Sequence, residues 1–163
     1  LLHALKNEQV KGAVLDCWEN EPDISMELLD YTDIATPHIA GYSRDGKANA
    51  TARVVQELAA WFGLPLQQWY PKNLEPPAAP GIEIPREGTT EERIRHAILH
   101  TYSVASDDYR LRSQPDSFEH LRNNYPTRRE FNAYSVAGTV DEKSAEILEQ
   151  LGFSVTSTVH HHH

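Results

Sequence analysis

Cysteine and methionine are almost absent from this chain of 163 residues, which has one of each, Cys17 and Met26. A single cysteine excludes a disulfide framework within the chain and a zinc cluster built on several thiolates. Basic residues are also few, with 15 Lys and Arg against 24 Asp and Glu, for a net charge of −9. This balance argues against nucleic acid as a main partner, because phosphate contacts need clustered basic side chains. No apolar run approaches the roughly 18–20 residues of a membrane span, so the sequence predicts a soluble protein.

The two ends of the sequence are unusual. The chain begins at Leu1 without an initiator methionine and closes with the histidines of 160–163. We expect residues 160–163 to be the remnant of a purification tag and the chain to be the C-terminal part of a longer protein.

A proline-rich stretch divides the sequence. Five of the ten prolines lie between Pro71 and Pro85. Because proline lacks an amide donor and fixes φ, this stretch cannot form a helix or a central strand. We therefore predict a linker at 71–80 between two parts, 1–70 and 81–159.

The first part alternates strands and helices. Residues 13–18 form a continuous apolar run of strand length, typical of a parallel sheet, and 34–36 predict a second short strand. Apolar residues then recur at helical spacing over 43–62, with Ser43 placed to cap the helix and Gly63 to end it. The predicted apolar face of this helix consists of Thr51, Val54, Val55, Leu58, Trp61 and Phe62.

The second part has the pattern of a small α+β domain. Three helix starts show the spacing of a capping box, Thr89 with Glu92, Asp116 with Glu119, and Thr139 with Glu142. Strand-like segments occur at 82–84, 131–136 and 153–155. We predict about three strands with helices on one face.

Polar side chains follow both predicted strands of the first part. They are Asp16, Glu19 and Glu21 after the first strand, and His38 after the second. Functional groups gather at the carboxyl ends of parallel strands, and a carboxylate beside an imidazole can set its tautomer for proton transfer. Spacing alone also allows a structural role, with His38 bonded to a backbone carbonyl and the acidic residues on a solvated loop.

Two motifs carry a resemblance to a known family. Residues 12–22, Gly-Ala-Val-Leu-Asp-Cys-Trp-Glu-Asn-Glu-Pro, and 35–41, Ala-Thr-Pro-His-Ile-Ala-Gly, resemble the D-isomer-specific 2-hydroxyacid dehydrogenases. Gly41-Tyr42-Ser43, followed by Asp45-Gly46-Lys47, is similar to one branch of that family, as are the segments 118–125, 128–131 and 151–153. The resemblance implies an α/β fold. It consists of the C-terminal remnant of a Rossmann-type nucleotide-binding domain with a long helix, followed by a small α+β dimerisation domain at 81–159.

The resemblance also implies roles for individual residues. Glu21 and His38 match the catalytic pair, Asp16 and Gly41 match residues that bind NAD, and Tyr42 matches a substrate contact. No metal is implied. We assign no chemistry to Trp18 or Glu19, and expect Trp18 to be a packed aromatic at a strand end.

The implied reaction is the oxidation of 4-phospho-D-erythronate by NAD, a step of vitamin B6 biosynthesis, in a cytoplasmic homodimer. The family's carboxylate-binding arginine and glycine-rich phosphate loop match nothing in this sequence. We therefore expect the chain alone to lack dehydrogenase activity, and to self-associate through 81–159 and through surfaces left without a partner.

Three other interpretations stay open at this point. The first is a family member that acts on phosphoglycerate or hydroxypyruvate, which the strand-end motifs fit equally well. The second is a non-catalytic assembly module in which 81–159 is the working part. The third is metal binding by His96 and His100, which lie four residues apart, together with the histidines of 160–163.

Overall fold

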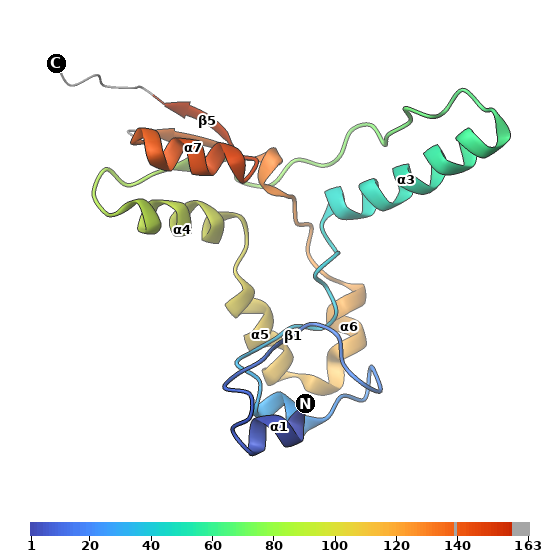
Figure 1. The fold of residues 1–163 in the computed structure, drawn as a ribbon, viewed down its shortest axis with the longest axis vertical. Helices are drawn as coiled ribbons and strands as arrows, with labels where there is room; N and C mark the ends of the chain where they lie inside the picture. Colours follow the sequence, from blue (N-terminus) through green and yellow to red (C-terminus); the bar gives the residue numbers. More distant parts are fainter. Residues whose placement is uncertain (139, 158–163) are drawn as a thin grey trace. The chain divides into compact units, whose positions relative to one another are not determined.

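A computed structural model describes residues 1–138 and 140–157 of the chain (Figure 1). These residues form two compact units, each built from two separate stretches of sequence. The first unit contains 1–42 and 103–126, and the second contains 43–102 and 127–157. This division by contacts differs from the predicted domains 1–70 and 81–159, which are ranges of sequence and stay a prediction.

Two short parallel strands form the centre of the first unit. In β1 (Val14–Leu15) and β2 (Ile34–Ala35), Val14 pairs with Ile34 and Leu15 with Ala35. Both strands are shorter than the predicted 13–18 and 34–36. The helices α1 (Leu2–Lys6) and α2 (Met26–Asp30) come before and between them. The Ser25 side chain accepts from the Leu28 amide and so begins α2.

A later stretch of chain completes this unit. It forms α5 (Val104–Ser113), the 3-10 turn η1 (Pro115–Ser117) and α6 (Phe118–Asn123). Asp108 of α5 accepts a hydrogen bond of 2.8 Å from the Ala35 amide, which satisfies a strand-edge donor that would otherwise be unpaired. Arg112 donates to the carbonyls of Leu29 and Thr32. The shared core consists of Trp18, Ile24, Leu29, Ala35, Leu111 and Phe118.

The long predicted helix begins the second unit. α3 (Arg44–Phe62) has Ser43 as its N-cap, with the side chain accepting from the Gly46 amide at 2.9 Å. Gly63 ends it in the left-handed conformation at φ 65°, as predicted. The predicted apolar face is largely exposed in this chain, and the buried residues of the helix are Asp45, Ala48, Ala52 and Ala59. Residues 71–80 contain no helix or strand.

The second unit also contains a three-stranded sheet in the order β3-β4-β5. The strands β3 (Gly81–Glu83), β4 (Ser135–Gly138) and β5 (Ser154–Ser157) are all parallel. The number of strands is confirmed, but parallel strands require crossover connections, so the arrangement is α/β rather than the expected α+β. The predicted strand 131–136 is wrong at its start, where η2 (Phe131–Ala133) forms a 3-10 turn.

Helices α4 (Thr90–Thr101) and α7 (Glu142–Gln150) pack together on the apolar face of this sheet (Figure 1). The predicted capping box of Thr89 with Glu92 is confirmed at the start of α4. At α7 the cap is Asp141, which accepts from the Ser144 amide at 3.0 Å. The predicted cap Thr139 lies outside the described residues. The predicted capping box of Asp116 with Glu119 is wrong, because the residue that precedes α6 is Ser117, which makes no side-chain cap bond.

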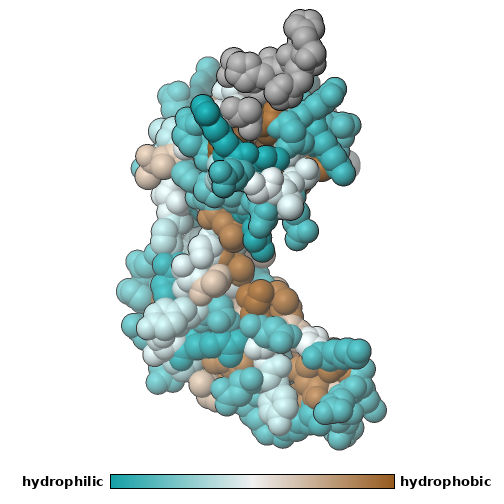
Figure 2. Space-filling view, turned by 90° about the vertical axis from the view of Figure 1, so that its left-hand side faces the viewer, coloured by the Kyte–Doolittle hydropathy of each residue, from teal (hydrophilic) through white to brown (hydrophobic). Residues whose placement is uncertain are grey.

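The face drawn in Figure 2 is mainly hydrophilic, with hydrophobic residues in patches between polar ones. Across residues 1–138 and 140–157, no helix combines the length and apolar character that crossing a membrane requires.

Candidate active site

The loops after β1 and β2 bring Glu21 and His38 into contact. The imidazole Nδ1 of His38 lies 2.8 Å from Oε2 of Glu21 and 3.1 Å from Oε1. Since an ionised carboxylate can only accept hydrogen bonds, Nδ1 carries a proton and donates a hydrogen bond to Glu21. This tautomer leaves Nε2 of His38 as the nitrogen that can accept a proton from another molecule. The His38 side chain is 41% exposed and that of Glu21 only 18%, so the imidazole is the accessible member of the pair.

Trp18 fixes the position of Glu21. The Trp18 backbone N–H donates to Oε1 of Glu21 at 2.8 Å, and its indole N–H donates to the carbonyl of Thr36 at 2.9 Å. One residue therefore joins the loop that carries Glu21 to the strand end that leads to His38. Trp18 is buried, which confirms its expected role as a packed aromatic at a strand end.

Asp16 holds the loop around His38. Its Oδ1 accepts from the Thr36 hydroxyl at 2.8 Å and from the Ile39 amide at 2.7 Å, and its Oδ2 accepts from the Ala40 amide at 3.1 Å. His38 itself has a φ of 55°, a left-handed conformation that costs a non-glycine residue about 1–3 kcal/mol and is common at functional sites. The three hydrogen bonds to Asp16 offset that cost and fix the direction of the imidazole.

The pKa of Glu21 lies below its ordinary value. Burial of the carboxyl works to raise this pKa, but hydrogen bonds from His38 and from the Trp18 amide lower it. The charges of His38 and Arg122 lower it further. Glu21 is thus held as a carboxylate, which is the form that orients and stabilises a protonated imidazole.

Tyr42 lies against α6 and the chain that follows it. Its ring packs edge to face on Tyr125, with centroids 6.3 Å apart, and the guanidinium of Arg122 lies 5.7 Å from its ring centroid. Tyr125 is fixed in turn by its hydroxyl, which donates to the buried Asp107 carboxylate at 2.7 Å. Arg110 pairs with the same carboxylate.

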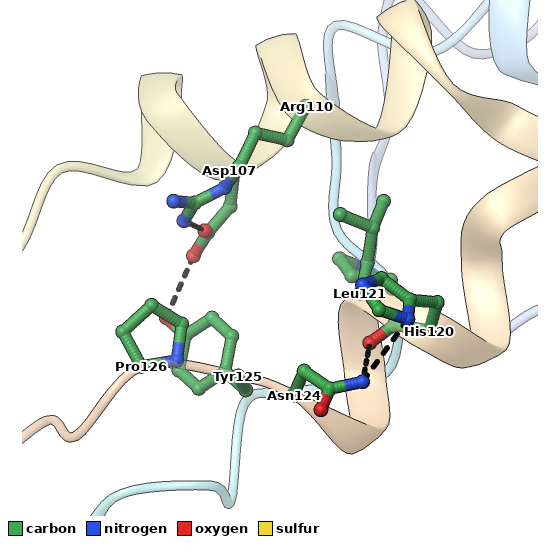
Figure 3. Close-up of a pocket in the computed structure, with 8 residues that line it drawn as sticks. Asp107, Arg110, His120, Leu121, Asn124, Tyr125 and Pro126 are labelled. Atoms are coloured by element: carbon green, nitrogen blue, oxygen red, sulfur yellow. Dashed lines mark hydrogen bonds and ion pairs between the residues drawn. The ribbon is translucent and has the colours of Figure 1, made fainter.

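Asp107, Arg110 and Tyr125 line a small pocket of about 120 Å³ (Figure 3). Pro37, the residue before His38, is part of its wall. Figure 3 shows Tyr125 directed at Asp107, and Asn124 directed at His120 in the same helical segment. Tyr125, on which Tyr42 packs, is one of the residues that line this pocket.

Asp16 and Gly41, the predicted NAD-binding residues, lie at the two loops around His38, and their contact with a cofactor stays a prediction. At Gly41 no atom lies within 4 Å of the position that a Cβ would take, so the backbone there faces open space. Three of about four acceptor positions on Asp16 are used by the protein, which leaves one for a ligand. A dinucleotide would also need a glycine-rich phosphate loop, and the sequence contains none.

Sequence reasoning brought Glu21 and His38 together correctly but missed Arg122. That residue lies on α6, far along the chain, and no local pattern connects it with a strand-end loop.

Within the described ranges, no group of three His, Cys, Asp or Glu side chains could hold a metal ion.

A histidine held by a carboxylate, on loops that follow two parallel strands, can accept or donate a proton at its free ring nitrogen. Comparison with known proteins relates the chain to a dehydrogenase over part of that enzyme's length. Residues 74–152 match a family described as a domain of unknown function, DUF3410. An erythronate-4-phosphate dehydrogenase of Porphyromonas gingivalis is 40% identical over 153 residues, covering 94% of this chain and 41% of that protein. The enzyme of that name from Bacteroides thetaiotaomicron is 43% identical over 138 residues, covering 85% and 37%.

The chain is homologous to the erythronate-4-phosphate dehydrogenases over most of its length. It spans about two fifths of the length of these relatives.

Proposed function

We propose that this chain supplies the acid–base part of the active site of an NAD-dependent dehydrogenase that oxidises 4-phospho-D-erythronate. The observation that carries the proposal is the 2.8 Å contact between Nδ1 of His38 and Oε2 of Glu21, in a chain homologous to enzymes named for this substrate. The substrate's carboxylate and the phosphates of NAD would be bound by parts of a longer protein that this chain does not contain.

In the proposed reaction, Nε2 of His38 accepts the proton of the C2 hydroxyl. The resulting imidazolium is stabilised by the Glu21 carboxylate, which receives the Nδ1 hydrogen bond. NAD, when bound, supplies the acceptor for the hydride that leaves C2. The alcohol thereby loses a hydride and a proton and becomes a 2-oxo acid, 2-oxo-3-hydroxy-4-phosphobutanoate. Asp16 and Trp18 keep the two loops in register, and Tyr42 contacts the substrate beside His38.

A chimera tests this function. The N-terminal portion of the Porphyromonas gingivalis relative, up to the start of its match, is joined to this chain, and formation of reduced nicotinamide is measured. We expect turnover with 4-phospho-D-erythronate and a clear preference over 3-phosphoglycerate. A preference for 3-phosphoglycerate would keep the fold and the pair but refute the substrate. Inactivity of a folded chimera with both substrates would favour the assembly-module interpretation.

The matched variants are His38→Gln and His96→Gln. His38→Gln should reduce kcat by about 10²–10⁴-fold while leaving the dissociation constant for NAD nearly unchanged. His96, an exposed histidine of α4, should tolerate the same change without loss. Similar losses in kcat and in NAD affinity would contradict the acid–base role of His38.

We also propose that the chain forms a homodimer through 81–159. A shallow groove on α4 and α7, of about 530 Å³, is lined by the apolar residues Ile94, Ile98, Leu99 and Ile147. Its lining also includes Glu91, Arg95 and Lys143, so in a second copy related by a two-fold axis Glu91 can face one of the two basic side chains. Leu99→Glu should shift the sedimentation coefficient toward the monomer, whereas Tyr109→Glu, at an exposed position on α5, should not. A dimer that survives Leu99→Glu would refute this surface.

A further inference from the structure

A guanidinium lies near the Glu21 carboxylate in addition to the imidazole of His38. Nη1 of Arg122 is 4.0 Å from Oε2 of Glu21, the same oxygen that accepts from His38 at 2.8 Å. His38 comes from the loop after β2 and Arg122 from α6. These are the charged groups that face Glu21 in the described part of the chain.

The structure holds Arg122 in place through the core of the first unit. Phe118, one turn earlier on α6, is 1% exposed and packs in the same cluster as Trp18. Leu121, the neighbour of Arg122, packs against that cluster too. The Trp18 backbone N–H also donates a hydrogen bond to Glu21. The same hydrophobic cluster therefore positions both the carboxylate and the arginine.

The contacts of Arg122 fit an electrostatic role better than a tight ion pair. At 4.0 Å the guanidinium is too far from Glu21 for a direct hydrogen bond. Its Nε is buried without a hydrogen-bond partner, and the planar group lies 5.7 Å from the ring centroid of Tyr42. An arginine stays charged at any pH the protein meets, whereas the imidazole of a working acid–base pair gains and loses its charge in each cycle.

We propose that Arg122 is a positioning residue of the candidate active site, whose permanent charge keeps Glu21 ionised and directed at His38 when the imidazole is neutral. The consequence for turnover rests on the proposed dehydrogenase function, but the effect on Glu21 does not. The pKa of Glu21 is lowered although burial works to raise it; the hydrogen bonds from His38 and the Trp18 amide contribute most to the lowering, and the charge of Arg122 contributes least. The proposal therefore rests on the position of the guanidinium at 4.0 Å from Oε2.

The first test measures Glu21 itself in this chain. The side-chain carboxyl of Glu21 is followed by carbon NMR across an acid titration in the wild type, Arg122→Lys and Arg122→Gln. The matched control is Arg53→Gln, which removes an exposed arginine that pairs with Glu57 on α3. We expect the titration midpoint of Glu21 to rise in Arg122→Gln, to stay close to the wild-type midpoint in Arg122→Lys, and to be unchanged in Arg53→Gln.

The second test uses the active chimera. The loss of kcat/KM in Arg122→Gln should grow as the pH falls, because Glu21 then becomes protonated at a higher pH than in the wild type. A uniform loss at every pH, or an unchanged Glu21 midpoint in an Arg122→Gln chain with native amide shifts, would overturn the proposal. Should Arg122→Gln fail to fold, a Glu21 midpoint in Arg122→Lys that does not respond to added salt would overturn it as well.

The two proposals fail in different ways. A chimera without dehydrogenase activity but with a Glu21 midpoint that depends on Arg122 would refute the function and support the arginine. An active chimera in which neither readout responds to Arg122 would refute the arginine alone.

Discussion

Replacing Asp16 with alanine is the sharpest test of how the candidate site is held together. The change removes the acceptor of three hydrogen bonds, from the Thr36 hydroxyl and from the amides of Ile39 and Ala40. A hydrogen bond to a charged group contributes about 1.5–3 kcal/mol, but Asp16 is only half-buried and water can replace part of each bond. We therefore expect Asp16→Ala to lower the free energy of unfolding by roughly 2–4 kcal/mol.

Two comparisons separate this effect from a general loss of charge. In Asp16→Asn the amide oxygen can replace Oδ1 but the NH₂ group faces the Ala40 N–H, so we expect a smaller loss of about 1 kcal/mol. Asp33→Ala is the matched control, because Asp33 accepts a hydrogen bond from the Ala13 amide, at 2.8 Å, away from the His38 loop.

The assay combines urea unfolding with amide hydrogen exchange at Ile39 and Ala40. Exchange at both amides should accelerate in Asp16→Ala and stay slow in Asp33→Ala. Unchanged exchange at these amides in Asp16→Ala would refute the view that Asp16 holds the left-handed His38 loop. In the active chimera, Asp16→Asn should lower kcat if the loop moves, whereas a rise confined to KM for NAD would support the predicted cofactor contact.

Three further predictions concern stability. Phe118→Ala should lower the free energy of unfolding by about 3–5 kcal/mol, because removing a fully buried ring leaves a cavity. In urea, the fluorescence change of Trp18 should then occur at a lower concentration, and an unchanged midpoint would contradict the shared core. Asp45 is buried against Arg129, with contacts of 2.8 and 3.1 Å, and its pKa is lowered although burial works to raise it. The stabilisation from Asp45 is therefore complete above its unfolded-state pKa and is lost as the pH falls through its folded-state pKa. In thermal melts, Asp45→Asn should reduce this loss of stability at acid pH. Thr89→Ala should cost about 1 kcal/mol in the same melts through loss of the capping box, and no loss would refute it.

Local chemistry explains what the sequence predicted well. Ser43 and Gly63 bound α3 because a hydroxyl cap and a left-handed glycine act within one helical turn. The contact of Glu21 with His38 was predictable for a related reason, since the ends of neighbouring parallel strands must meet at one edge of a sheet.

Long-range contacts explain what the sequence did not reveal. Helix α5 has few apolar positions, and it is held by Asp108 at the Ala35 amide and by Arg112 at two carbonyls of the first unit. Polar contacts of this kind leave no periodic signal. Arg122 was missed for the same reason, because its partner lies in a loop from the opposite end of the sequence.

The discontinuous make-up of the first unit affects how the chain can be cut. A protease nick at 71–80 would leave one fragment with residues 1–42 and another with 103–126, each carrying part of the same hydrophobic core. The nicked halves should therefore co-purify and separate only in denaturant. By the same reasoning, a segment 81–159 expressed alone would expose Leu111 and Phe118, and would need its N-terminal fragment added in trans to become soluble.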